Sequence, residues 1–171
     1  MYKIGDLIQY GGTGVCRISE IKTQPLPGSD EQRLYYVLQP LYKACVISVP
    51  VDSDKVSIRP IISRQEADRL ISQIPQREPK PFHSRASREL AEHYGNLMKE
   101  NSCDSWIDLT ISIHSKKQKI QAQKRKMGSV DERFLKQAED MLFGELAAAL
   151  EIPKDQVREY ISAKLEEQKA G

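Results

Sequence analysis

The sequence predicts an α+β protein in which a small N-terminal β-barrel precedes an all-α helical domain. Up to about residue 60, short β-rich runs alternate with turns that contain Gly and Pro. From Ser63 onward, apolar residues instead recur at the three- and four-residue spacing of amphipathic helices. The period changes near Arg59-Pro60, so we expect two domains, at residues 1–60 and 61–171.

The predicted strands are short and closely spaced. Residues 2–18 contain two of them, joined at the glycine-rich corner of residues 11–14, and two more follow at residues 34–41 and 45–51. Several short strands in so small a span bury their apolar faces only by closing into a sandwich or barrel. The glycines lead into a strand and lack the Gly-Lys-Ser/Thr ending of a phosphate-binding loop, which favours a tight turn.

Helical signals follow in order along the second domain. Ser63 and Glu66 are spaced as a capping box, and the apolar stripe after them stops at Pro75. Residues 75–83 hold three prolines, which predicts an extended segment. Four further helices are predicted beyond it: residues 84–101, residues 104–126, a helix after a second capping box at Ser129 and Glu132, and a last helix that begins near Pro153.

Composition favours a soluble protein without a general affinity for polyanions. The 26 Lys and Arg residues nearly balance 24 Asp and Glu residues, so the formal net charge is +2 at pH 7. No run approaches the roughly 20 apolar residues of a membrane span, and the N-terminus shows no charged-then-apolar signal. Three cysteines without a CxxC pair indicate reduced cytosol, so we expect a cytoplasmic protein.

No residue pattern indicates catalysis, and we expect no enzyme activity, no cofactor and no metal site. The histidines His83, His93 and His114 lack the helix-face spacing of metal ligands and have no accompanying Cys or carboxylate pattern. Cys103 could act as a nucleophile with a histidine as base. A thiol at a helix start among polar neighbours is usually a bystander, however, so this role is disfavoured.

A basic segment without any acidic residue lies between Asp108 and Asp131. Exposed helices ordinarily mix both charges for pairing across one turn. The segment therefore forms either a solvated helix face or a contact with nucleic acid or an acidic protein, and composition leaves both readings open. Its six basic residues are Lys116, Lys117, Lys119, Lys124, Arg125 and Lys126.

Phe82 is the single aromatic residue of the proline-rich segment, and Arg85 and Arg88 follow it. An exposed aromatic ring beside arginines suits stacking on an unpaired base or insertion at a distorted base step. The alternative, that Phe82 packs the segment onto the helical domain, is favoured by the residues alone. Trp106 keeps helical register with Leu109 and is expected in the core.

Three stretches of the chain carry a family resemblance: residues 1–16 (MYKIGDLIQYGGTGVC), residues 49–63 and residues 131–147. In this order, and from end to end, they resemble the CarD/CdnL family of bacterial transcription regulators. The resemblance implies a Tudor-like, SH3-like barrel, shared with the transcription-repair coupling factor, that binds the β subunit of RNA polymerase. It also implies that the helical domain touches promoter DNA at the upstream edge of the transcription bubble.

The resemblance further implies site residues. In the family an aromatic residue, usually Trp, wedges into the minor groove and stabilises the open complex; here Phe82 is the nearest aromatic, with Arg85 and Arg88 placed for phosphate contact. Gln24 and Ser48 stand where some relatives carry arginine, so contact through backbone strand pairing would survive and salt bridges would not. The implied polymerase-contacting residues are Lys22, Gln24, Ile47, Ser48 and Val49.

Together these observations predict a monomeric, non-enzymatic regulator that binds the polymerase β subunit and, weakly, promoter DNA, and that thereby stabilises the open complex. The alternative is an SH3-like barrel adaptor that joins proteins or contacts RNA without a promoter role. A pull-down separates the two, because polymerase β is the dominant partner only under the first. An enzyme that uses Cys103 or the histidines is the third possibility, and alkylation of the thiols would abolish its function.

Overall fold

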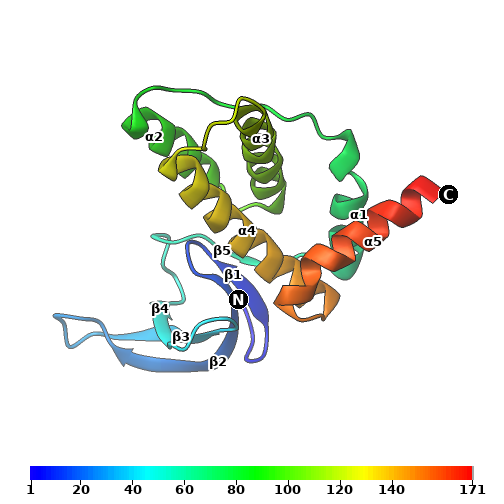
Figure 1. Ribbon diagram of the computed structural model, residues 1–171. Coiled ribbons are helices and arrows are strands. Elements are labelled where there is room, and N and C mark those ends of the chain that lie inside the picture. The colour runs from blue at the N-terminus through cyan, green and yellow to red at the C-terminus, as the bar shows by residue number, and fades with distance from the viewer. Residues whose placement is uncertain (171) are drawn as a thin grey trace. The chain divides into compact units, whose positions relative to one another are not determined.

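The computed structural model describes residues 1–170 and divides the chain into two compact units. The first unit is Met1–Ile61 and the second begins at Ile62. Figure 1 shows strands throughout the first unit and helices throughout the second. The predicted α+β class, with a barrel-like sheet before the helices, is thus confirmed.

The first unit is one antiparallel sheet with the strand order β4-β3-β2-β1-β5. The long strand β2 pairs with both β1 and β3, and its register shifts between Ile18 and Glu20, where a bulge bends the strand. The bend allows the sheet to curl around its own apolar face. The strands are β1 (Leu7–Tyr10), β2 (Gly14–Pro25), β3 (Gln32–Pro40), β4 (Ile47–Pro50) and β5 (Ile58–Pro60).

The glycine-rich corner is a tight turn between β1 and β2, as predicted. The Thr13 amide donates to the Tyr10 carbonyl at 3.0 Å. Gly12 and Gly14 have φ angles of 83° and 112°, a region that residues with a Cβ rarely adopt. The turn therefore needs glycine for its backbone conformation.

Alternate strand residues form the core of the first unit. Cys16 lies in this core, and burial raises the pKa of its thiol to about 11, so the thiol stays protonated at neutral pH. The buried members of the cluster come from four of the strands: Ile8, Cys16, Ile18, Tyr36, Leu38 and Val49.

The second unit contains five α-helices within the described residues. The Ser63 hydroxyl accepts from the Glu66 amide at 3.1 Å, which confirms the first predicted cap. The helices are α1 (Arg64–Ser72), α2 (Ser87–Met98), α3 (Cys103–Ala122), α4 (Ser129–Leu150) and α5 (Val157–Ala170), with short 3-10 turns at Ile74–Gln76 and Lys154–Gln156.

Several predicted helix boundaries are wrong, and α2 (Ser87–Met98) is three residues shorter at each end than the predicted residues 84–101. Gly128, not Ser129, is the N-cap of α4, and no side chain caps this helix. Helix α3 ends at Ala122 rather than Lys126, because Lys124 adopts a left-handed φ of 57°. The Lys124 amide then donates to Gln121 and the Arg125 amide to Ile120, the two hydrogen bonds of a Schellman C-cap.

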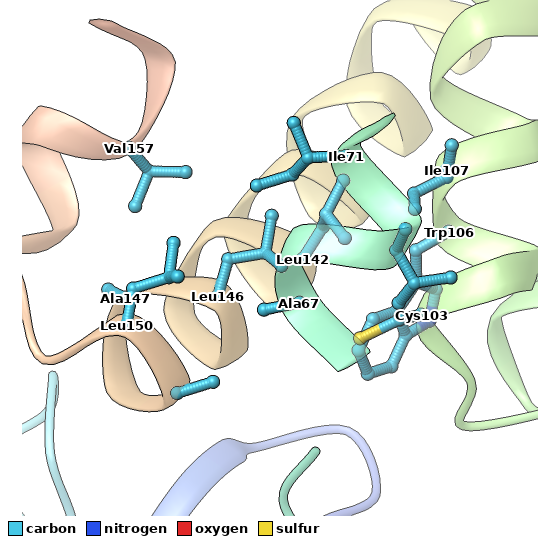
Figure 2. Close-up of a cluster of buried hydrophobic side chains, with 12 residues drawn as sticks. Ala67, Ile71, Cys103, Trp106, Ile107, Leu142, Leu146, Ala147, Leu150 and Val157 are labelled. Atoms are coloured by element: carbon cyan, nitrogen blue, oxygen red, sulfur yellow. The ribbon is translucent and has the colours of Figure 1, made fainter. Parts of the chain in front are cut away.

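Four helices converge on the larger core of the second unit (Figure 2). Trp106 is fully buried there, as predicted. The labelled side chains come from α1 (Ala67, Ile71), α3 (Cys103, Trp106, Ile107), α4 (Leu142, Leu146, Ala147, Leu150) and α5 (Val157). Over residues 1–170, none of the helices combines the length and apolar character that crossing a membrane requires.

Candidate nucleic-acid and protein interfaces

The proline-rich segment is attached along one face of α3. Arg77 donates to Asp104 at 2.5 Å and to Asp108 at 2.9 Å. The amide of Lys80 donates to the Ser112 hydroxyl at 2.9 Å. We call residues 77–82 the strap.

The carbonyl of Phe82 ends the strap by accepting from the Lys116 ammonium at 3.0 Å. The helix residues that hold the strap are therefore spaced four apart, at positions 104, 108, 112 and 116. Residues at this spacing share one face of a helix. The strap consequently runs along α3 from its first turn toward its last turns.

Lys116 also forms a buried ion pair. Its ammonium lies 3.0 Å from a carboxylate oxygen of Asp131 in the first turn of α4, and the two side chains are only 7% and 5% exposed. The Tyr94 hydroxyl of α2 donates to the same oxygen at 2.5 Å. Burial raises the pKa of Tyr94, and the bond to Asp131 raises it further, so the hydroxyl remains a donor.

This pair changes the interpretation of the basic segment. Lys116 is buried and its ammonium is occupied by Asp131 and the Phe82 carbonyl. Lys116 is therefore not available for contact with DNA. Lys117 is partly exposed and lies 3.8 Å from Glu132, so α4 supplies the acidic partners that the segment itself lacks.

The ring of Phe82 stacks on the imidazole of His93 in α2. The ring centroids are 3.8 Å apart and the planes differ by 12°. Phe82 is half-buried and packs against a second apolar cluster of the helical unit, which is the packing role that the residues alone favoured. The stack and this cluster thus fix the position of the ring, and the residue as a whole is not fully buried.

The remaining predicted basic residues are exposed. Within residues 1–170, none of them forms an ion pair with an acidic side chain. Arg125 donates to the Gln123 side chain at 3.3 Å. We call this set the basic end: Arg85, Arg88, Lys119, Lys124, Arg125 and Lys126.

The buried ion pair explains why the residues of the basic end lie in the same region of the helical unit, although they come from different segments of the chain. Lys116 lies in the last two turns of α3, its partner Asp131 lies in the first turn of α4, and Phe82 precedes α2. The end of α3 and the start of α4 are therefore joined to the segment that enters α2. Figure 1 shows the loop after α3 and the start of α2 at the same end of the helical unit.

Glu145 is a buried carboxylate that sequence reasoning missed. Its oxygens accept from the Ile62 amide at 2.9 Å and from the Cys103 thiol at 3.2 Å. The signal was present, because Glu145 keeps the register of Leu142 on the apolar face of α4, where a charge is unexpected. Cys103 and Glu145 thus join α3 and α4 at the entry to the second unit.

The three histidines do not gather around Cys103. His93 stacks on Phe82, and His114 lies 3.3 Å from a carboxylate oxygen of Glu139. Among the described residues, no group of three or more His, Cys, Asp and Glu side chains is placed to hold a metal ion.

The predicted polymerase-contacting residues fall on two faces of the N-terminal sheet. Val49 pairs with Tyr36 and is buried in the core, and Ile47 packs against the same cluster. Ser48 lies between them in β4 and faces away from the core. The Val51 amide donates to the Leu34 carbonyl, and in this register the backbones of Val49 and Ile47 also face β3, so Ser48 is the β4 residue whose amide and carbonyl point to the open edge.

Lys22 and Gln24 of β2 lie on the same outer face as Ser48. Lys22 is exposed and lies 3.9 Å from Glu20, and Gln24 is half-buried. Strand β4 stands at the edge of the sheet, with β3 as its one strand neighbour in residues 1–170. The sheet thus presents an open backbone edge beside the outer-face residue Ser48.

Comparison with known proteins identifies the first unit. Residues 2–62 match the family model described as the CarD-like/TRCF RID domain, a family whose members interact with RNA polymerase. The match ends within one residue of the end of the first structural unit, Ile61. No curated protein matches the chain. The N-terminal unit is therefore similar to the CarD-like/TRCF RID domain, which supports the CarD-like resemblance that residues 1–16 and 49–63 carry.

Proposed function

We propose that the protein is a non-enzymatic transcription regulator that docks on the β subunit of RNA polymerase and stabilises the promoter open complex. In this proposal the N-terminal unit docks, and the helical unit contacts DNA at the upstream edge of the bubble. The observation that carries it is the Phe82 ring, held by the strap and His93 and accompanied by the exposed cations of the basic end.

Docking is assigned to the edge strand β4. The amide and carbonyl of Ser48, which point away from β3, suit pairing with an extended strand of a partner. Such pairing does not need the arginines that Gln24 and Ser48 replace. Ser48 would pair with the added strand and Ile47 and Val49 would hold β4 on β3, whereas Lys22 and Gln24 lie on β2, beyond β3, on the same outer face.

DNA contact is assigned to the basic end and to Phe82. If three or four cations of the basic end touch phosphate, affinity for free DNA should fall about a hundredfold between 50 and 200 mM salt. Near physiological salt the dissociation constant for free DNA should be weak, ~10⁻⁴ M. Attachment to polymerase supplies an effective DNA concentration of about 1 mM. Occupancy then reaches roughly ten to one, so a net charge of +2 suffices for a tethered domain.

The effect on transcription would be a population shift. A protein that contacts the melted promoter better than the closed one favours the open complex by that difference in affinity, and no covalent step is required. Insertion of the Phe82 ring at the upstream fork would supply such a difference, because the ring fits only where base stacking is already disturbed.

The lifetime of the open complex tests the proposal. Phe82→Ala should shorten the lifetime while polymerase affinity stays unchanged, and the double variant Arg85→Ala/Arg88→Ala should shorten it most at low salt. Lys99→Ala is the matched control, because Lys99 is an exposed lysine just after the far end of α2. If Phe82→Ala left the lifetime unchanged, the wedge assignment would be removed.

A further inference from the structure

The loop between β3 and β4 exposes an unusual number of apolar side chains. All six of its residues, Leu41-Tyr42-Lys43-Ala44-Cys45-Val46, are exposed. The side chains of Leu41, Tyr42 and Val46 are 36%, 40% and 67% exposed. In the described part of the chain, these three make up half of the large apolar side chains that are exposed. We call residues 41–46 the apolar loop.

The apolar loop lies at the end of the open sheet edge. Val46 directly precedes β4, the edge strand. The start of the loop is fixed to the sheet, because the Leu41 amide donates to the Val15 carbonyl at 3.0 Å. A strand added to β4 would therefore bring its own side chains, or those of the domain that carries it, next to Val46.

The edge strand alone offers little specificity. β4 has only four residues, and main-chain hydrogen bonds are the same for any extended partner. Its outward-facing Ser48 is small and uncharged, and Pro50 cannot donate a backbone hydrogen bond. In protein interfaces, most of the affinity comes from a few apolar or aromatic side chains that become fully desolvated.

We infer that the apolar loop is the side-chain anchor of the polymerase contact, with Val46 seated against an apolar surface of the polymerase beside the strand that pairs with β4. This inference rests on the proposed docking through β4 and specifies its chemistry. The loop carries a single charge, Lys43, so the contact is hydrophobic rather than electrostatic. The docking step should therefore be insensitive to salt, unlike the DNA contact of the helical unit.

Binding of the full-length protein to purified RNA polymerase tests the inference, at 50 and 300 mM salt. Val46→Ser should weaken binding about tenfold or more at both salt concentrations, because burial of one Val side chain contributes about 1.5 kcal/mol or more. Val46→Leu, which keeps an apolar side chain, should bind as the unchanged protein does. Ile4→Ser is the matched control, because Ile4 is 64% exposed in the same unit.

The control lies away from the proposed contact. The backbone next to Ile4 bonds to β2 on the side opposite β3, since the Gly5 amide donates to the Ile18 carbonyl. Circular dichroism melting should show that all three substitutions leave the fold intact. The inference is overturned if Val46→Ser binds like the unchanged protein, or if 300 mM salt weakens binding as strongly as it weakens DNA binding. If the unchanged protein fails to bind polymerase, the proposed function itself fails.

Discussion

The ammonium of Lys116 and the carboxylate of Asp131 lie 3.0 Å apart in the interior of the helical unit, 15 residues apart in the sequence. This pair joins α3 to α4, and through the Phe82 carbonyl and the Tyr94 hydroxyl it also holds the strap and α2. Removing one partner of such a pair leaves the other charge buried without compensation.

Lys116→Met should therefore destabilise the helical unit by about 3–5 kcal/mol, since the Asp131 carboxylate would keep only the Tyr94 hydroxyl. Trp106 is the single Trp of the chain and is buried in this unit, so its fluorescence during urea unfolding follows this unit alone. Lys126→Met, at an exposed position, should change stability by less than about 0.5 kcal/mol. Equal effects of the two substitutions would contradict the buried pair.

The two serines of the predicted capping boxes should respond differently to alanine. Ser63→Ala should cost about 1 kcal/mol, because the Ser63 hydroxyl accepts from the first turn of α1. Ser129→Ala should be nearly neutral, since Gly128 takes the N-cap position of α4. The same Trp106 fluorescence measures both, and a large loss for Ser129→Ala would contradict this assignment of the α4 boundary.

Glycine should be tolerated better at position 124 than at position 126. Lys124 has a φ of 57° at the end of α3, so Lys124→Gly should stabilise the helical unit by about 0.5–1 kcal/mol. Lys126 has no such backbone conformation, and Lys126→Gly should be neutral or slightly destabilising. Because each substitution removes one exposed positive charge, both should weaken DNA binding to a similar extent. Thermal melting and a DNA titration separate these two effects.

His93 should influence promoter opening through the ring that it supports. His93→Ala leaves Phe82 without its stacking partner at 3.8 Å, so it should shorten the open-complex lifetime, though less than Phe82→Ala does. His93→Phe preserves a stacked ring and should restore the lifetime. Polymerase affinity serves as the internal reference. If the open-complex lifetimes of His93→Ala and His93→Phe simply followed the thermal stabilities of the two variants, His93 would have no role in positioning the Phe82 ring.

Acid should weaken the contact between α1 and α5. Burial of Asp68 raises its pKa, but hydrogen bonds from Lys164 at 2.8 Å and Tyr160 at 2.7 Å outweigh this effect and hold the pKa below its usual value. A lowered pKa contributes stability above the unfolded-state value of about 3.9, and this stability is lost as the pH falls through the folded-state pKa. Asp68→Asn should cost about 1 kcal/mol at pH 7 and progressively less below pH 4. A constant difference across this range would refute the assignment.

The order of strands β1 to β4 and of the five helices could be predicted from the sequence because it depends on local periodicity and turns, whereas the three-residue strand β5 (Ile58–Pro60) was not predicted. The tight turn before Gly14 and the cap at Ser63 both follow from residue types a few positions apart. The end of α3 and the start of α4 were predicted wrongly because they depend on backbone conformations that several residue types can adopt. Lys124 adopts the left-handed conformation that ends many helices and that is usually occupied by glycine, so the sequence did not indicate that α3 ends there.

The candidate site was harder to predict because its contacts join distant segments. The basic segment contains no acidic residue, yet Lys116 and Lys117 find carboxylates at Asp131 and Glu132 on the next helix. Similarly, the stacking of Phe82 on His93 depends on how the strap runs along α3. Local composition indicates where charge accumulates, whereas tertiary packing decides which of those charges remain available to a partner.

The regular spacing of the strap anchors also constrains the length of this connection. Surface loops rich in proline usually accept an added or deleted residue at small cost. Here, one inserted residue between Arg77 and Phe82 would shift every later contact out of step with the four-residue repeat of α3. The Phe82 ring would then move away from His93. The number of residues between Arg77 and Phe82 therefore determines whether the ring reaches its stacking partner.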